Sequence, residues 1–573
     1  MNPSQRSRAR IGLICALIAA GLLAASLYWT QVVKGSSYAA KAQAQYVKPA
    51  GNLFDRGTIF FQPKDGGHIA AATVSSGFVA YMNPTAVTDP SGEYEAISSY
   101  LTLDKADFLR RAAKPNDHYE ELAKQVDAAM AASIQGLALP GIGVVKETWR
   151  SYPGNDLAAH VLGLVGEDAS SSVPSGKYGL ERSYESVLSR PPIGSSANAF
   201  ASMFSSFGSV FGNAVPDEGD VVTGIEPTVQ GYLQKLLSDT EATWHSDEIG
   251  GVVIDPNTGQ IVAMASLPTF DPNDTSNVRD ISLFDDPMVQ HVYELGSIMK
   301  PLTMATALDT GAVTPDTTYD DTGCMTLDKK KICNYDGRAR GVIPMQQILS
   351  QSLNVGAATI ALKVGKDGMY RYFTSFGLAT STGIDLPGEG RGITSNLKEG
   401  KDIDIATASY GQGIAISPVN MARALSIIAN GGYLVTPHIA SEIDYSDGRV
   451  VPVDPPRSGP VLKPQTVDEV RQMLIKVVDG TMAPAHSDMN FDHYSVAAKT
   501  GTAEIADPVH GGYYPDRYLH SFFGFFPATQ PKFLVFLYQI YPKGAEYASE
   551  TLTDPFAEMA KFLMNYYNIP PDR

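Results

Sequence analysis

The residues best suited to chemistry are a serine and a lysine three positions apart, Ser297 and Lys300. On a helix this spacing places both side chains on one face, one turn from each other. A serine hydroxyl is a weak nucleophile at neutral pH, and an adjacent amine activates it by taking its proton. Pro301 suits the first turn of a helix, because its missing N–H leaves no hydrogen bond unmade there. The spacing alone is a weak signal, since Ser395 and Lys398 repeat it.

Two further stretches supply the other groups that such a site needs. Ser352 and Asn354 form a Ser-x-Asn motif, and Lys499, Thr500 and Gly501 form Lys-Thr-Gly. Taken singly, the first pair could be a helix cap and Lys499 an exposed strand residue. In chain order, however, the motifs read Ser-x-x-Lys, Ser-x-Asn and Lys-Thr-Gly, the signature of penicillin-binding proteins and serine β-lactamases. The ordered series predicts one active site in which an alcohol, two amines and an amide converge.

Length and charge narrow the class of protein. A chain of 573 residues is long enough for several domains with large cores. Its formal charge of −17 argues against binding to nucleic acid. Cysteine and histidine do not occur with the spacing of metal ligands, so we expect neither a metal nor another cofactor.

The N-terminal residues have the pattern of a membrane anchor. Arg6, Arg8 and Arg10 precede an uncharged stretch, 11–33. As a helix this stretch would span about 34 Å, enough for a bilayer core of about 30 Å. The basic flank predicts that 1–10 is a cytoplasmic tail and that the rest of the chain lies outside the bacterial cell membrane. A cleaved signal peptide is the alternative, but the length of the uncharged run favours a retained single-pass anchor.

Outside the cytoplasm, paired cysteines can oxidise. Cys324 and Cys333 could form a disulfide that closes a short loop. Two cysteines are too few for a structural framework, so free thiols are the alternative.

The remaining chain divides into two domains by its pattern. Residues 34–218 are β-rich, with a strand expected at 74–82 and two or three helices between 94 and 135. The end of this domain, 190–217, is rich in Pro, Gly and Ser, which favours a flexible insert. Its phenylalanines recur at helical spacing, so an apolar helix face or an ordered hairpin are the alternatives. Residues 219–573 form the second domain.

The second domain has strands at both ends and helices between them. Strands are expected at 249–254, 260–265, 494–505, 519–526 and 533–541, and helices at 227–243, 418–430 and 555–567. This order is typical of one antiparallel sheet covered by helices. The predicted fold class is therefore α+β and multi-domain.

Over nearly the whole region beyond the predicted anchor, the chain resembles a class B penicillin-binding protein, the membrane-anchored monofunctional transpeptidase of cell-wall synthesis. The resemblance implies that 34–218 is a non-catalytic pedestal of the dimerisation type and that 219–573 is the transpeptidase domain. The stretch 299–320 is more similar to the septal, cell-division branch than to the elongation branch. The other stretches that carry the resemblance are Arg56-Gly57-Thr58-Ile59, Gly179-Leu180-Glu181, Gly411-Gln412-Gly413 and His520 to Pro527.

The resemblance also implies roles for the motif residues. Ser297 would attack the D-Ala–D-Ala carbonyl of a donor stem peptide, with Lys300 as the base. Burial and the nearby cation of Lys499 would lower the pKa of Lys300. Ser352 would relay a proton to the leaving amine, and Asn354 would hold Lys300 and the donor peptide.

The Lys-Thr-Gly strand would bind the donor. Lys499 would attract its terminal carboxylate, Thr500 and Thr502 would donate hydrogen bonds, and Gly501 would let the peptide approach the strand closely. The oxyanion hole would be the backbone N–H groups of Ser297 and Thr502. β-Lactam antibiotics, which mimic the donor, should leave a stable acyl group on Ser297.

The same resemblance implies partners and rival functions. A separate membrane glycosyltransferase, a polymerase of the SEDS type, would act with the chain and with other division proteins. The alternatives are an elongation-branch transpeptidase, a D,D-carboxypeptidase, a β-lactamase or a penicillin-sensing receptor. We expect no signalling region in residues 1–10, which disfavours the receptor.

Overall fold

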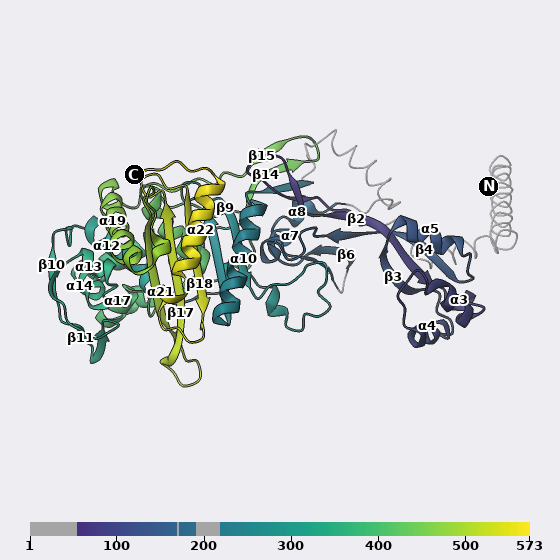
Figure 1. The fold of residues 1–573 in the computed structure, drawn as a ribbon, viewed down its shortest axis with the longest axis horizontal. Helices are drawn as coiled ribbons and strands as arrows, with labels where there is room; N and C mark the ends of the chain where they lie inside the picture. Colours follow the sequence, from purple (N-terminus) through teal and green to yellow (C-terminus); the bar gives the residue numbers. More distant parts are fainter. Residues whose placement is uncertain (1–53, 169–170, 191–217) are drawn as a thin grey trace, which may run out of the picture. The chain divides into compact units, whose positions relative to one another are not determined.

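The computed structural model describes residues 54–168, 171–190 and 218–573 (Figure 1). The predicted cytoplasmic tail 1–10, the predicted anchor 11–33 and nearly all of the insert 190–217 lie outside these ranges. Within them, no helix combines the length and the apolar character needed to cross a membrane. The chain divides into two compact units.

The smaller unit includes residues 74–149. Each of the three α-helices described within 74–149 begins after an aspartate whose side chain accepts a hydrogen bond from a first-turn N–H, which satisfies a donor that the helix leaves free. The helices predicted between 94 and 135 are confirmed, but the polar strand among them, EELAKQV, does not alternate and is not predicted. Its elements are α3 (Pro90–Ile97), α4 (Lys105–Ala112), β3 (Glu120–Val126), α5 (Ala128–Gly136) and most of β2 (Ile69–Met82) and β4 (Ile142–Ser151), whose ends at 69–73 and 150–151 belong to the larger unit.

The larger unit is built on a five-stranded sheet in the order β16-β17-β18-β8-β9. Every neighbouring pair is antiparallel, so the predicted antiparallel sheet is confirmed. The two strands before the catalytic motifs form a hairpin, and three strands from the end of the chain complete the sheet. The bounds are β8 (Glu248–Ile254), β9 (Ile261–Leu267), β16 (Ala497–Ala506), β17 (Tyr513–Phe526) and β18 (Phe533–Ile540).

Helices cover both faces of this sheet, as two adjacent glycines of β8 show. A Cβ on Gly250 would meet Met288 of α11 (Pro287–Gln290), whereas a Cβ on Gly251 would meet Leu233 of α10 (Pro227–Trp244). Because successive residues of a strand point to opposite faces, α10 and α11 lie on opposite faces. Helix α22 (Thr553–Tyr566) packs with α10 (Figure 1). Helix α18 (Pro418–Ala429) packs with α11.

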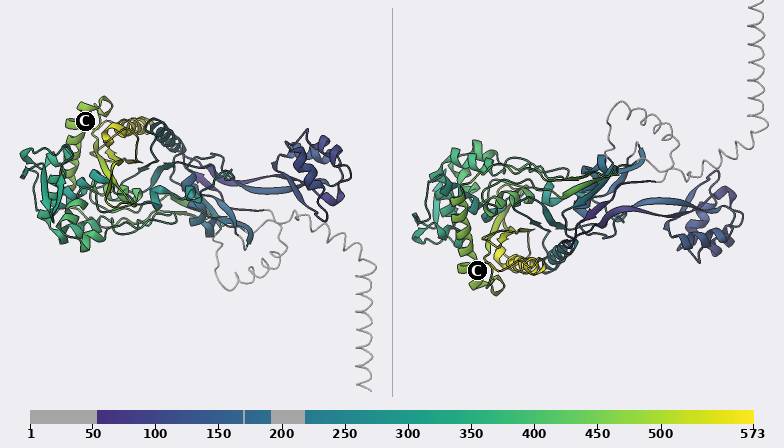
Figure 2. Two further views of the ribbon diagram at one scale, coloured as in Figure 1. Left: turned by 90° about the horizontal axis from the view of Figure 1, so that it is seen from below. Right: turned by 90° about the horizontal axis from the view of Figure 1, so that it is seen from above.

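The segment between β9 and β16 is mostly helical, and most of its helices lie together, coloured teal to green in Figures 1 and 2. Its hairpin of β14 (Ala440–Tyr445) and β15 (Val450–Pro452) lies apart from them and pairs with β7 (Gly219–Thr223). The segment contains the first two catalytic motifs. Helix α14 packs on α12, and α19 packs on both α12 and β16, so these contacts bring the motifs to the Lys-Thr-Gly strand. The bounds are α12 (Lys300–Asp309), α14 (Asn354–Val364) and α19 (Pro464–Val477).

The larger unit also holds a buried ion-pair cluster, made by residues of the predicted pedestal stretches. The Glu181 carboxylate accepts hydrogen bonds from Arg56 Nε and from Arg150 Nε, each at 2.6 Å. The Glu181 side chain is fully buried, and both arginines are nearly so. Arg56 also donates to Glu185 at 2.6 Å, and Arg150 donates to the Gly57 carbonyl at 2.7 Å. The cluster ties together three separate chain segments, around residues 56–57, 150 and 181–185.

Candidate active site

Ser297 lies on a tight turn that leads directly into a buried helix. The turn, η4 (Gly296–Met299), is a 3₁₀ helix, and α12 begins at Lys300 with Pro301 in its first turn. Pro301 is therefore placed as predicted, whereas Ser297 precedes the α-helix by one turn rather than opening it. Every residue of α12 is buried, so the Lys300 side chain is fixed by packing on all sides.

The Lys300 amine lies at the centre of the first two motifs. Its Nζ is 2.8 Å from Ser297 Oγ and 3.1 Å from Ser352 Oγ. It also donates to the Ser352 carbonyl at 2.6 Å and to Asn354 Oδ1 at 2.8 Å. The residue is 0% exposed. The predicted meeting of Ser297, Lys300, Ser352 and Asn354 is therefore found in the structure.

These contacts suit a neutral amine. The Ser352 carbonyl and Asn354 Oδ1 can only accept, so each takes one N–H of Lys300. A neutral amine then has a lone pair left, and the Ser297 hydroxyl lies within hydrogen-bond distance of it. Burial, and secondarily the charge of Lys499, holds the pKa of Lys300 well below its usual value of 10.5. The geometry and the pKa thus both favour Lys300 as a proton acceptor.

Lys499 approaches the same serine from the sheet. Its Nζ donates to Ser352 Oγ at 3.1 Å and to the Thr500 carbonyl at 2.9 Å. The side chain is 2% exposed, and burial lowers its pKa to about 7. Ser352 Oγ therefore links two amines, one from α12 and one from β16.

Ser352 itself has an unusual backbone. Its φ of 54° lies in the left-handed region, which few residues other than glycine adopt. The bond from Lys300 to its carbonyl and the bond from Leu353 N to the Ile348 carbonyl, at 3.0 Å, hold the turn. Such strain is common where a side chain must be aimed at a site.

Three glycines behind Ser297 allow the backbones of neighbouring segments to pack in direct contact. A Cβ on Gly296 would lie 2.6 Å from the Thr502 carbonyl oxygen, and one on Gly411 would lie 2.2 Å from the Gly296 carbonyl oxygen. A Cβ on Gly501 would lie 2.3 Å from Ser521 Oγ and 2.8 Å from the Leu295 carbonyl oxygen. The structure thus shows a packing role for Gly501, because its bare face admits the nucleophile turn. Its predicted role in letting the donor peptide approach the strand stays a prediction.

The catalytic groups open into a cleft of about 690 Å³. Ser297, Ser352 and Asn354 lie on its wall, together with Thr500 and Thr502 from the predicted binding strand. Thr502 Oγ1 accepts a hydrogen bond from Ala548 N at 3.0 Å, so its hydroxyl hydrogen remains for another partner. Side chains that the motifs do not include complete the wall: Lys331, Tyr335, Tyr410, Gln412, Glu504, Tyr518, Glu546 and Tyr547.

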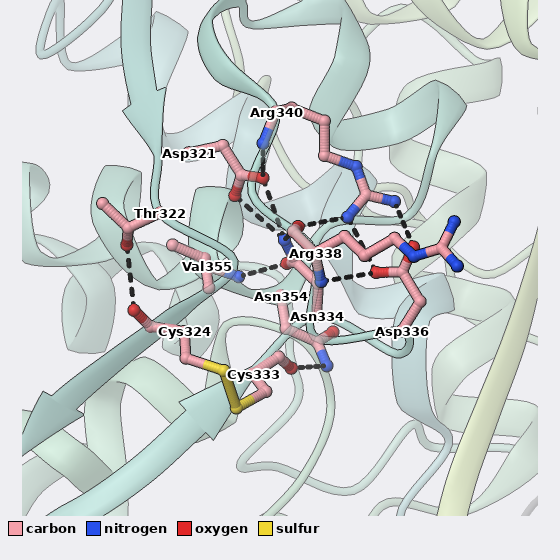
Figure 3. The surroundings of a disulfide bond; sticks show 10 residues. All are labelled: Asp321, Thr322, Cys324, Cys333, Asn334, Asp336, Arg338, Arg340, Asn354 and Val355. Atoms are coloured by element: carbon pink, nitrogen blue, oxygen red, sulfur yellow. Dashed lines mark hydrogen bonds and ion pairs between the residues drawn. A yellow bond between two sulfur atoms is a disulfide. The ribbon is translucent and has the colours of Figure 1, made fainter.

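A disulfide lies beside the cleft. Cys324 and Cys333 are bonded and stand directly opposite each other in the hairpin of β11 (Cys324–Leu327) and β12 (Lys330–Cys333), as Figure 3 shows. The Cys333 carbonyl accepts a hydrogen bond from Asn354 Nδ2 at 3.0 Å. In the ranges that the structure describes, no cluster of His, Cys, Asp or Glu is suited to a metal ion.

Comparisons with known proteins agree with this architecture. Residues 249–560 match the family described as "Penicillin binding protein transpeptidase domain", and 55–191 match "Penicillin-binding Protein dimerisation domain". Stage V sporulation protein D of Bacillus subtilis is 28% identical over 97% of this chain and 84% of its own length. Peptidoglycan D,D-transpeptidase FtsI of Escherichia coli is 25% identical over 97% of this chain and 91% of its own length.

A solved structure shares the fold. Penicillin binding protein 3 of Mycobacterium tuberculosis, complexed with aztreonam, superposes with a TM-score of 0.67 at 23% identity, over 91% of this chain and 98% of that one. The transpeptidase match alone spans more than half of the chain. With its dimerisation domain and its convergent lysine and serine motifs, the chain belongs to the penicillin-binding protein transpeptidases, as a class B member and a serine-type D-Ala–D-Ala transpeptidase.

Proposed function

We propose that the chain cross-links peptidoglycan stem peptides through an ester on Ser297. The observation that carries the proposal is the buried row of Ser297 Oγ, Lys300 Nζ, Ser352 Oγ and Lys499 Nζ, with successive distances of 2.8, 3.1 and 3.1 Å. Such a row provides a nucleophile, its base and a path for the proton, which are the parts that covalent acyl transfer requires.

The proton path follows from the donors and acceptors. Ser297 Oγ bonds to the D-Ala–D-Ala carbonyl carbon while its proton passes to the lone pair of Lys300. The new ammonium has a third N–H, which lies within reach of Ser352 Oγ. Ser352 then gives its own proton to the amine as the C–N bond breaks, and D-Ala leaves. The amine of a second stem peptide attacks the ester, and the protons return along the same path to Ser297.

Donor binding falls to the edge strand β16. Protonated Lys499, with the hydroxyls of Thr500 and Thr502, attracts the terminal carboxylate of the donor. The backbone N–H groups of Ser297 and Thr502 stabilise the oxyanion. A β-lactam presents a similar carboxylate and carbonyl, and its opened ring stays attached to Ser297. The relative from Mycobacterium tuberculosis described as complexed with aztreonam supports this part of the proposal.

Labelling with a penicillin tests the nucleophile. The full chain exposed to a fluorescent penicillin is expected to gain one acyl group, which peptide mass spectrometry finds on Ser297, and Ser297→Ala is expected to gain none. Ser395→Ala is the matched control, because Ser395 has the same spacing to a lysine but lies on α16 (Ser395–Glu399). Full labelling of Ser297→Ala would refute the assignment.

Product analysis separates the rival activities. A transpeptidase joins two stem peptides, whereas a carboxypeptidase releases D-Ala with water as the acceptor. A β-lactamase turns over nitrocefin many times, whereas this chain should stall after one turnover. A receptor would bind penicillin and form no cross-link. The chain is therefore incubated with a polymerase and lipid-linked substrate that carries radiolabelled terminal D-Ala, and both the released D-Ala and the cross-linked product are measured. Nitrocefin hydrolysis is measured separately.

We further propose the setting in which the enzyme acts. Residues 11–33 anchor it in the bacterial cell membrane, 34–218 form its pedestal, 219–573 form its catalytic domain, and a SEDS-type polymerase and division proteins are its partners. The similarity of 299–320 to the septal branch supports a role in division. Depletion in the source bacterium is then expected to give filaments with blocked septa. Rounded or bulging cells would assign it instead to elongation.

A further inference from the structure

We infer that Cys324, Cys333 and Asn334 are positioning residues for acylation, because they hold the Cys333 carbonyl where it orients the Asn354 amide against Lys300. The inference rests on the proposed function, in which Lys300 is the base. It concerns residues outside the three catalytic motifs. Figure 3 shows the disulfide, Asn334 and Asn354 side by side.

The Cys333 carbonyl decides which way the Asn354 amide faces. A carbonyl oxygen can only accept, so the amide must turn Nδ2 toward it, at 3.0 Å. Oδ1 is then left facing Lys300 Nζ, at 2.8 Å. In the opposite orientation, Nδ2 would point its hydrogens at the amine and Oδ1 would face the carbonyl. Lys300 would lose one of the two acceptors that direct its lone pair toward Ser297.

The hairpin that carries this carbonyl packs on α14 through β12, where Ile332 is buried, but it gains no support from another strand in the described residues. Strands β11 and β12 pair only with each other in the described part of the chain. An isolated two-stranded hairpin is marginally stable in water. The disulfide joins Cys324 and Cys333 at the open end of the hairpin. The Cys333 carbonyl at this end is the one to which Asn354 donates. Asn334 N also donates to the Gly323 carbonyl at 2.9 Å, which continues the pairing beyond the disulfide.

Asn334 ties the end of the hairpin to the start of α14. Its Nδ2 lies 2.9 and 3.0 Å from the two carboxylate oxygens of Asp321. Its Oδ1 accepts from Val355 N at 3.1 Å, in the first turn of α14. Asn334 is 3% exposed and Asp321 is 0% exposed, so water does not compete strongly for these bonds. Asn354 is therefore held both through its helix and through its own amide.

The test compares the rate of acylation with its extent. In the full-length Cys324→Ser/Cys333→Ser variant, the first-order acylation rate constant with a fluorescent penicillin is expected to fall at least about tenfold, since small misplacements of catalytic groups are costly. The final labelling should still reach one acyl group per chain. If the disulfide only stabilised the fold, the result would be the reverse. The final labelling would fall, because fewer molecules would be active, but those molecules would react at the normal rate.

The link through Asn354 is tested by a double-mutant cycle. In an Asn354→Ala background the serine substitutions are expected to cause little further slowing, because the side chain they orient is gone. Asn334→Ala should behave in the same way. The same fold reduction in both backgrounds, or no reduction in either, overturns the inference.

Reversible reduction of the disulfide in the wild-type chain tests the inference without relying on the folding of a substituted variant. Dithiothreitol reduces the disulfide to two thiols and is itself oxidised to a cyclic disulfide. After its removal, the reduced wild-type chain should acylate slowly and recover on reoxidation, whereas the double serine variant should not respond. An unchanged rate in the reduced chain refutes the inference while Ser297 is still labelled. Absence of any label on Ser297 refutes the proposed function instead.

Discussion

At the residue scale, the proposed mechanism depends on two buried lysines that must carry different charges. In that mechanism, Lys300 must be neutral to accept a proton, and Lys499 must be charged to attract a carboxylate. Burial lowers the pKa of both, that of Lys300 well below 10.5 and that of Lys499 to about 7. The mechanism requires that Lys300 loses its proton at a lower pH than Lys499 does. Burial then allows Lys300 to act as a base while Lys499 still attracts a carboxylate.

The lowered pKa values of Lys300 and Lys499 predict how acylation depends on pH. The second-order rate constant for a penicillin is expected to rise with pH through the pKa of Lys300, as its neutral form accumulates. It should fall again as the pH passes through about 7, where Lys499 loses its charge. Stopped-flow labelling across the pH range in which the chain stays folded measures this profile. A rate that keeps rising through alkaline pH would show that the charge of Lys499 is not needed.

The coupling of the two lysines gives a second prediction. Removing the Lys499 charge by Lys499→Gln relieves the repulsion that helps to lower the pKa of Lys300. The acid limb of the acylation profile should therefore move to higher pH, and penicillin should bind more weakly. Lys331→Gln is the matched control, because Lys331 lines the same cleft but is exposed. An equal movement of the limb in both variants would contradict the coupling.

At the scale of elements, the nucleophile turn depends on its contact with β16. A methyl group on Gly501 would collide with Ser521 Oγ and with the Leu295 carbonyl, which belongs to the main chain and cannot rotate away. Gly501→Ala is expected to lower stability by about 1–3 kcal/mol, as overpacked cores do. It should also slow acylation, because the turn carrying Ser297 must shift.

Thermal unfolding and penicillin labelling measure the two effects of Gly501→Ala. Gly480→Ala is the control, because a Cβ there meets nothing within 4 Å and the position is helical and exposed. That control should be neutral or slightly stabilising, since alanine favours helix. Normal acylation in Gly501→Ala would mean that the turn tolerates displacement.

At the scale of the whole molecule, the ion-pair cluster around Glu181 joins distant parts of the chain. Glu181→Ala leaves Arg56 and Arg150 buried without their shared carboxylate, and loss of one partner of a buried pair typically costs about 3–5 kcal/mol. The denaturation midpoint should fall accordingly. Asp239→Ala, which breaks an exposed pair with Lys235, should barely change it. Equal midpoints for the two variants would contradict a structural role for the cluster.

Much of this architecture follows from local sequence pattern. The five strands of the central sheet and helices α10, α18 and α22 lie where apolar periodicity predicts them, because these segments are buried and long. The polar strand β3 escapes prediction, since few of its side chains face a core. The motif order likewise predicts that Ser297, Lys300, Ser352, Asn354 and Lys499 converge, and the hydrogen bonds confirm their proximity.

Other features of the site require the tertiary structure. The left-handed backbone of Ser352 and the orientation of the Asn354 amide arise from contacts with residues far away in the sequence. Asn334 has no motif of its own, and only its bonds to Asp321 and Val355 reveal its position. The packing of Gly501 against Ser521 and Leu295 also appears only in the structure, because a strand pattern cannot show which face of the strand is crowded.

The three glycines behind Ser297 have a consequence for antibiotic selection. A Cβ on Gly296, Gly411 or Gly501 would lie closer to a carbonyl oxygen than real side chains do, so substitutions on this wall are expected to displace the turn that carries Ser297. Resistance substitutions are therefore expected on the rim of the cleft instead. Side chains such as Tyr335 and Tyr547 line it and lie outside the three motifs, so their substitution is expected to change drug access with less effect on the proposed cross-linking.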